Sequence, residues 1–149
     1  LYDVNDDAHH QGNNGGERIW DGDSIQISLD CGNEKTVNYD KNDYELGFAK
    51  AESGDIGYVW THPDVTQTGV LEECYIKIIR DDNNKRTRYL VRLPQIFISA
   101  MQLKSGNIFG MNYAVHDADL TTRERMFEVT EGTIYSKNPS KYYNWRLEN

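Results

Sequence analysis

The chain has 149 residues, which suits one domain with a core of ordinary size, and 38% of them are hydrophobic. Acidic residues outnumber basic ones by 24 to 16, so the formal net charge of -8 argues against nucleic acids and anionic membranes as partners. No segment approaches the roughly 20 consecutive apolar residues of a membrane-spanning helix.

Short segments of alternating hydrophobic and polar residues recur along the chain, as is typical of half-buried strands. In chain order we expect strands near residues 1–4, 24–29, 44–48, 56–61, 73–80, 86–93, 108–116, 125–130 and 145–147. Clusters of Gly, Asn and Asp separate them. Residues 94–104 carry apolar side chains near helical spacing and predict a short helix or an irregular crossover. The whole pattern predicts an all-β fold, an antiparallel β-sandwich of the immunoglobulin or jelly-roll kind with little helix.

Three blocks in the sequence carry more specific information: a polar loop leading into Trp20-Asp21-Gly22-Asp23-Ser24-Ile25, the segment 109–119, and Asn138-Pro139-Ser140-Lys141-Tyr142. In this order, from Val4 to Leu147, they resemble the family 9 carbohydrate-binding modules. The resemblance implies a β-sandwich attached to extracellular polysaccharide-degrading enzymes, with structural calcium and a sugar held between two aromatic side chains. It also implies further strands upstream, so we expect residues 1–149 to be a single domain that is incomplete at its N-terminus.

The resemblance carries over to individual residues unevenly. Trp20 stands where the family has one of its two stacking Trp residues, and Tyr135 is the aromatic candidate for the other. Gln26 replaces an acidic residue of the family and can still hydrogen-bond a hydroxyl group. Gly47 and Ala114 stand where the family has an Arg and a Gln, so two polar sugar contacts are missing.

The residues themselves support a sugar site. A pyranose has an apolar face that stacks on an indole and a rim of hydroxyls that amides and carboxylates recognise, and an acidic protein suits a neutral glycan. Trp20 lies in a polar loop before a strand, which favours ligand contact over burial in the core. Asn112 shares one strand face with His116 and is a second candidate for ligand contact. Trp60 and Trp145 fit strand interiors, so we expect both in the core.

The Asp-rich segments predict a cation site, because calcium takes 6–8 oxygen ligands from carboxylates, amides and carbonyls. Asp6, Asp7, Asp21 and Asp23 are the candidate ligands of a structural Ca²⁺, and the alternative is a solvated acidic loop without a metal. His9 and His10 are adjacent and are better explained by a polar loop than by a transition-metal site. The redox state of Cys31 and Cys74 stays open.

These observations lead to a non-catalytic carbohydrate-binding module that is extracellular or on the cell surface. It would bind a neutral oligosaccharide or polysaccharide and direct an attached enzyme to it. The first alternative is a structural or protein-interaction sandwich that has lost sugar binding, as Gly47 and Ala114 suggest. A second is a haem-binding electron-transfer domain, for which Met101, Met111, His62 and His116 are nominal ligands. A glycosidase needs two suitably spaced carboxylates, but the sequence singles out no such pair and we assign no catalytic residue.

Overall fold

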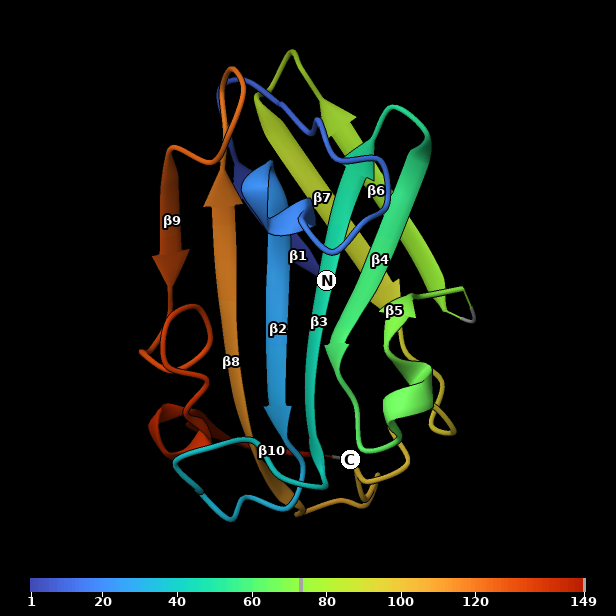
Figure 1. Cartoon of the computed structure of the whole chain (residues 1–149), viewed down its shortest axis with the longest axis vertical. Coiled ribbons are helices and arrows are strands. Elements are labelled where there is room, and N and C mark those ends of the chain that lie inside the picture. Colours follow the sequence, from blue (N-terminus) through green and yellow to red (C-terminus); the bar gives the residue numbers. More distant parts are fainter. Residues whose placement is uncertain (73, 149) are drawn as a thin grey trace.

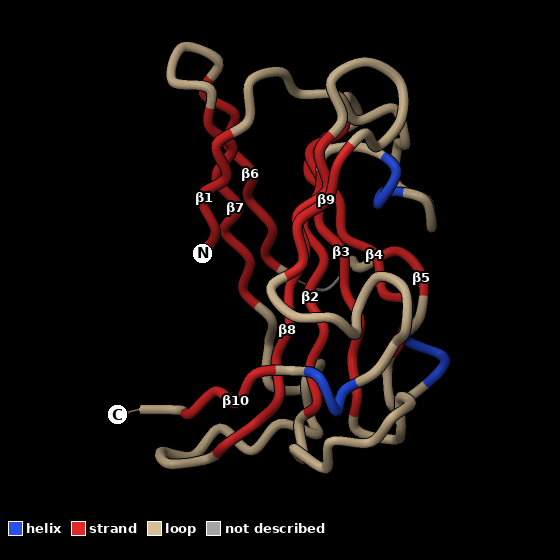
Figure 2. The backbone as a smooth tube through the Cα atoms, turned by 90° about the vertical axis from the view of Figure 1, so that its left-hand side faces the viewer, coloured by secondary structure: helices blue, strands red, loops and turns tan. Residues whose placement is uncertain are grey.

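The computed structural model describes residues 1–72 and 74–148 and consists of two antiparallel sheets that face each other (Figures 1 and 2). The strands are β1 (Tyr2–Asn5), β2 (Ser24–Asp30), β3 (Asp43–Ala51), β4 (Gly54–Thr61), β5 (Gly69–Val70), β6 (Tyr75–Asp81), β7 (Arg86–Arg92), β8 (Ile108–Asp117), β9 (Arg125–Glu128) and β10 (Tyr143–Arg146). Short 3₁₀ helices are η1 (Ile19–Asp21), η2 (Val65–Gln67) and η3 (Pro139–Lys141). The predicted antiparallel β-sandwich with little helix is therefore confirmed.

The large sheet has the strand order β10-β8-β2-β3-β4-β5. The long strand β8 also pairs with β9, which runs beside residues 114–117, whereas β10 runs beside residues 108–111. The small sheet has the order β1-β7-β6 and lies behind the large sheet in Figure 1. Every pairing between these strands is antiparallel. In the large sheet β2 lies between β3 and β8.

The hydrophobic core lies between the two sheets. Alternate residues of β2 and β3, such as Ile25 and Phe48, point into it and meet Ile78 and Tyr89 from the small sheet, all of them at most 2% exposed. The predicted alternation thus selects the core face correctly. The opposite face of β2 is buried as well, although the sequence pattern predicts a half-buried strand. The cause is that the loops around η1 and η3 fold back over this outer face (Figure 2).

Residues 94–104 form the irregular crossover that was one of the two expectations, not a helix. Turn hydrogen bonds from Phe97 N to Pro94 O and from Met101 N to Ile98 O shape it. The near-helical spacing of Ile96, Ala100 and Leu103 does not mark a buried face, because Ile96 is 83% and Leu103 is 51% exposed. Phe97, Ile98 and Met101 are the buried core residues of this segment. The expected strand at 73–80 is found from Tyr75 onward, and Glu73 lies outside the described residues.

The two cysteines are not joined in a disulfide. The Cys31 thiol is buried, and its burial, followed by the nearby carboxylates, raises its pKa to about 12. Such a thiol is a poor nucleophile and behaves as a small core side chain. Among the described residues, no helix has the length and apolar character needed to cross a membrane.

Candidate functional site

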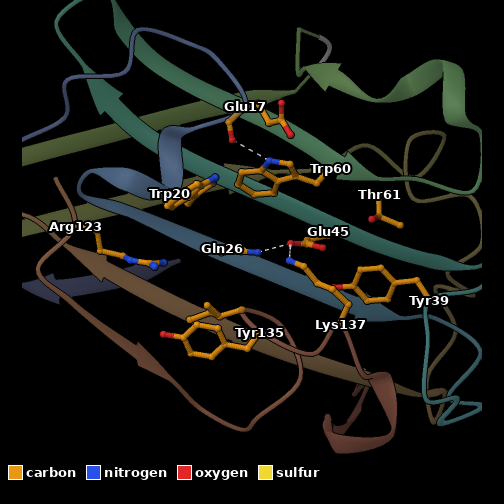
Figure 3. A pocket seen from close by; sticks show the side chains of 11 residues that line it. Glu17, Trp20, Gln26, Tyr39, Glu45, Trp60, Thr61, Arg123, Tyr135 and Lys137 are labelled. Carbon is orange, nitrogen blue, oxygen red and sulfur yellow. Dashed lines mark hydrogen bonds and ion pairs between the residues drawn. The ribbon is translucent and has the colours of Figure 1, made fainter.

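A cavity of about 450 Å³ lies on the outer face of the large sheet, the face that points away from the core (Figure 3). The strands supply its floor, and the loops that cover this face supply its walls. It is lined by Glu17, Trp20, Gln26, Tyr39, Glu45, Trp60, Thr61, Arg123, Ile134, Tyr135 and Lys137. Its volume falls in the usual range of small-molecule sites, and its lining combines aromatic rings with a few convergent polar groups.

Trp20 is placed in this cavity by η1. The neighbouring Ile19 is fully buried and anchors the short helix against the sheet, whereas the Trp20 side chain is partly exposed. Two guanidinium groups lie over the indole: the Arg18 carbon at 5.7 Å and the Arg123 carbon at 5.1 Å from the ring centroid. Both distances are within the range of cation–π attraction. The structure thus places Trp20 at a cavity wall, as the sequence predicts for a ligand contact.

The cavity floor is a continuous chain of polar side chains that crosses three strands. Arg123 Nη1 donates to His116 Nδ1 at 3.1 Å, and His116 Nε2 donates to Gln26 Oε1 at 3.0 Å. The Gln26 amide then donates to Glu45 Oε1, which also accepts from the Lys137 ammonium (Figure 3). This series of hydrogen bonds gives each of these buried polar groups a partner and so holds the Gln26 amide in one orientation at the cavity floor.

His116 stays neutral in this network. Burial first, and then the charges of Arg123 and Lys137, lower the pKa of His116 to about 3. A neutral imidazole offers one donor and one acceptor, which is what its two hydrogen bonds require. The imidazole therefore links Arg123 to Gln26 by hydrogen bonds, holds both side chains in place, and adds no charge to the floor.

Trp60 also lines the cavity, and its predicted place in the core is wrong. It belongs to β4, where the pairing with β3 shifts: Glu45 pairs with Thr61 and Leu46 with Val59, which leaves Trp60 as an extra residue. Its neighbour Val59 points into the core with 1% exposure, so alternation turns Trp60 to the opposite, outer face. Trp145 is not in the core either, because it lies on β10, an edge strand of the large sheet, and is 42% exposed.

Tyr135 stands at the cavity rim with 78% of its surface exposed, opposite Trp20 and Trp60 (Figure 3). It comes from the loop between β9 and η3. Asn138 caps η3, since its Oδ1 accepts hydrogen bonds from Ser140 N at 3.1 Å and Ser140 Oγ at 2.6 Å. The structure thus brings Trp20, Gln26 and Tyr135 into one cavity, as the sequence suggests.

Asn112 lies outside the cavity. Its side chain is fully buried, and its amide nitrogen donates to Glu128 Oε1, Thr130 O and Thr133 Oγ1 at 2.8–2.9 Å. Its amide oxygen accepts from Thr130 N at 3.0 Å. These bonds occupy the whole amide, so Asn112 holds the loop after β9 and has no free group for a ligand.

Sequence reasoning missed Tyr39, Glu45, Arg123 and Lys137 as cavity residues. Glu45 lies in the expected strand at 44–48 and on its polar face, so its position was available from the alternation. The other three come from loops, whose path over the sheet no local pattern reveals. Lys137 even has a positive φ of 46°, which places it at a sharp change in chain direction.

The predicted cation ligands are distributed over different environments. Asp6 and Asp23 belong to acidic clusters, one formed with His9 and another in which Asp6 meets Asp117 and Asp119, with ligand atoms within 4.8 Å of one another. Asp7 and Asp21 belong to neither of these clusters, and Asp21 instead pairs with Arg18 at 2.6 Å.

The cluster of Asp6, Asp117 and Asp119 fits a calcium ion chemically. Asp6 Oδ2 is bound by Arg80 Nη1 at 2.8 Å, but the buried Asp6 Oδ1 and Asp119 Oδ1 have no hydrogen-bond partner. Burial raises the pKa of Asp6 and of Asp117, the usual result when carboxylates gather without sufficient compensation. Unpaired carboxylate oxygens that converge are the ligands that calcium prefers.

The nominal haem ligands are engaged elsewhere. The two ring nitrogens of His62 are 3.0 Å from Asp64 O and 2.9 Å from Phe97 O, and both nitrogens of His116 belong to the floor network. An axial ligand needs a free imidazole nitrogen. The geometry therefore gives no support to a haem site at either histidine.

Comparison with known proteins places this geometry in context. The family model described as "Carbohydrate family 9 binding domain-like" matches residues 1–149. A family 9 carbohydrate-binding module from Caldicellulosiruptor kristjanssonii, solved with cellotriose, superposes with a TM-score of 0.70 at 17% identity, covering 99% of this chain and 67% of that one. Its structure with glucose gives 0.70 at 18% identity, covering 99% and 68%. No curated protein matches in sequence.

Proposed function

Because the chain belongs to the carbohydrate family 9 binding domain-like family, we propose that the cavity on the outer face of its large sheet binds a neutral glycan. The observation that carries the proposal is the combination in one cavity of aromatic side chains, Trp20, Trp60 and Tyr135, with a polar floor built around Gln26 and Glu45. Aromatic rings suit the apolar face of a pyranose, and amide and carboxylate oxygens suit its hydroxyls.

The charges around the cavity favour a neutral ligand over an anionic one. Glu45 and Lys137 neutralise each other within the floor, and the chain as a whole carries a formal charge of -8. The negative net charge of the protein would repel an anionic sugar. The structures of the C. kristjanssonii module contain cellotriose and glucose, which makes glucose-based oligosaccharides the first ligands to test.

Isothermal titration calorimetry with cellotriose, xylotriose and mannotriose tests the proposal. We expect saturable binding of at least one trisaccharide, and Trp20→Ala should weaken it roughly tenfold or more, the usual cost of losing a central aromatic contact. Trp145→Ala is the matched control, because Trp145 is an exposed indole remote from the cavity. Flat titrations with all three sugars would favour the alternative of an interaction domain without a sugar site.

We further propose that the domain acts without catalysis, outside the cell, by holding an attached enzyme on a polysaccharide. The support is the family together with the engagement of Glu45, whose carboxylate is bound by Gln26 and Lys137 and is poorly prepared to act as a general acid. Hydrolysis of a chromogenic glycoside is the test of the non-catalytic part. A hydrolytic activity that co-purifies with the protein and that Glu45→Gln abolishes would refute it.

A structural Ca²⁺ is proposed at Asp6, Asp117 and Asp119, in place of a set that includes Asp7 and Asp21. The support is the pair of buried oxygens without partners, Asp6 Oδ1 and Asp119 Oδ1. When bound, the ion would supply compensating charge and would link the end of β8 to the segment that follows β1.

A further inference from the structure

Gly47 and Trp60 form an unusually close contact on the cavity floor. A Cβ atom added to Gly47 would lie 2.3 Å from Cη2 and 2.6 Å from Cζ3 of the Trp60 indole. Real Cβ atoms essentially never come so close to another heavy atom. The six-membered part of the indole therefore occupies the space that any side chain at position 47 would need.

Alternation along β4, together with a β-bulge, explains which side chains reach this place. Thr61 pairs with Glu45 and Val59 pairs with Leu46, so Trp60 is the extra residue of a bulge and keeps the outward direction that alternation gives it after Val59. Val59 still points into the core with 1% exposure, whereas Trp60 and Thr61 both line the cavity. The bulge thus places Thr61 on the outer face as well, and Trp60 lies directly above Gly47, which has no side chain.

The orientation of Trp60 is held by fixed neighbours. Its Nε1 donates to Glu17 O at 3.0 Å, and its ring lies 5.5 Å from that of Tyr58 at a tilt of 51°. Ile19 Cδ1 approaches the same point above Gly47, 3.1 Å from the position of the added Cβ. An aromatic surface that is held in this way loses little conformational entropy when a ligand stacks on it.

The two indoles of the cavity differ in what covers them. Arg18 and Arg123 lie over the ring of Trp20. Within the described part of the chain, no cation lies over the ring of Trp60, which faces the cavity in Figure 3. A sugar that stacks on Trp60 meets no guanidinium over the ring, whereas the ring of Trp20 is within cation–π range of two.

We propose that Trp60, seated on Gly47, is the stacking platform of the site and that Trp20 is a side wall. The proposal rests on the proposed glycan binding and specifies how it is achieved. A pyranose lying on Trp60 has its hydroxyl rim next to Gln26, which pairs with Gly47 across the strands, and next to Glu45, two residues along β3. Neutral pyranoses with one unsubstituted apolar face are the ligands that fit this arrangement.

Titrations of single and double variants test the platform, with the trisaccharide that binds the wild type most tightly. Trp60→Ala should weaken binding at least tenfold and at least as much as Trp20→Ala. Gly47→Ala deletes no ligand contact, yet its methyl group displaces the indole and should cause a comparable loss. In the Trp60→Ala background the same methyl group has room, so Gly47→Ala should have little further effect.

Controls separate this result from a loss of fold. Gly16→Ala adds a methyl group with nothing within 4 Å and should leave affinity unchanged. Trp60→Phe keeps an aromatic face but loses the hydrogen bond to Glu17, so it should retain part of the affinity. Circular dichroism should show the same sheet content in every variant. If the wild type binds and Trp60→Ala binds equally well, or if Gly47→Ala costs the same in both backgrounds, the platform is refuted while glycan binding stands. If the wild type binds none of the three sugars, both proposals fail.

Discussion

At the scale of single residues, the buried polar side chains of this protein divide into two kinds. Those of the cavity floor are matched by partners: His116 is neutral between Arg123 and Gln26, and Glu45 is paired with Lys137. Asp43, at the start of β3, is not matched. It is 1% exposed, and although its Oδ2 accepts a hydrogen bond from Asp40 N at 2.6 Å, its Oδ1 has no partner.

Asp43 should therefore make stability depend on pH. Burial first, and then the charges of Asp40 and Asp30, raise its pKa to about 7, well above the value near 4 of an unfolded chain. The folded protein thus binds this proton more tightly, so the destabilisation from Asp43 is complete above about pH 7 and disappears as the pH falls to about 4.

Replacing this carboxyl group by an amide isolates its effect. Asp43→Asn should be more stable than the wild type at pH 8, on the order of 1 kcal/mol or more, and the difference should shrink toward pH 5. Urea unfolding at several pH values measures it, and Glu52→Gln, an exposed acid, is the control. A difference that grows as the pH falls would show that Asp43 has the opposite role.

At the scale of elements, the cavity depends on loops that are tied to the strands by buried side chains. Asn112 of β8 makes four hydrogen bonds with the segment 128–133, which leads to Tyr135 and Lys137. The Glu128 carboxylate adds a bond from Ile134 N at 3.2 Å. The sequence suggested Asn112 as a ligand contact because of its strand face, and that face is correct, but a loop covers it.

Removing the Asn112 amide should loosen this loop. Asn112→Ala leaves several buried groups without partners, so we expect a loss of about 2 kcal/mol or more in unfolding free energy. Amide hydrogen exchange should speed up in residues 128–137, and sugar affinity should fall because Tyr135 and Lys137 lose their positions. Ser140→Ala, which removes one hydroxyl contact to Asn138, is a milder control. Wild-type stability with reduced affinity would instead mean that Asn112 contacts the sugar directly.

At the scale of the whole molecule, the acidic cluster joins residues next to strands of both sheets. Asp6 follows β1 of the small sheet, and Asp117 and Asp119 come from the end of β8 in the large sheet. Arg80 of β6 compensates one oxygen of Asp6 at 2.8 Å. The remaining carboxylates repel one another, so this end of the sandwich is where a bound cation would stabilise the packing of the sheets most.

Calcium should accordingly raise the melting temperature. At a free concentration 100-fold above its Kd, a ligand that binds only the folded state adds about 2.7 kcal/mol. We expect a concentration-dependent rise with Ca²⁺ in calorimetric scans, reversal by a chelator, and a much smaller rise in Asp119→Asn. Magnesium at equal concentration and Glu52→Gln are the controls. An identical calcium response in Asp119→Asn and the wild type would place the ion elsewhere.

The sequence by itself determined the sandwich and one wall of the site. Alternation with a period of two is a local property, so it located nearly all the strands and their core faces, and the polar residues around Trp20 indicated its exposure. Pairing between distant strands decided the rest. Trp60 lies over Gly47 only because β4 pairs with β3 in this register, and Gly47 is significant only because that indole lies on it.

Loops account for the remaining differences between expectation and structure. Arg123 and Lys137 reach the floor, and Asn112 is covered, because chain segments far apart in sequence fold over the same strands. A loop's path is set by its contacts with the sheet below it and leaves no periodic signal in the sequence. Only the tertiary structure could therefore show that the outer face of this sheet, and Trp60 with it, forms a cavity.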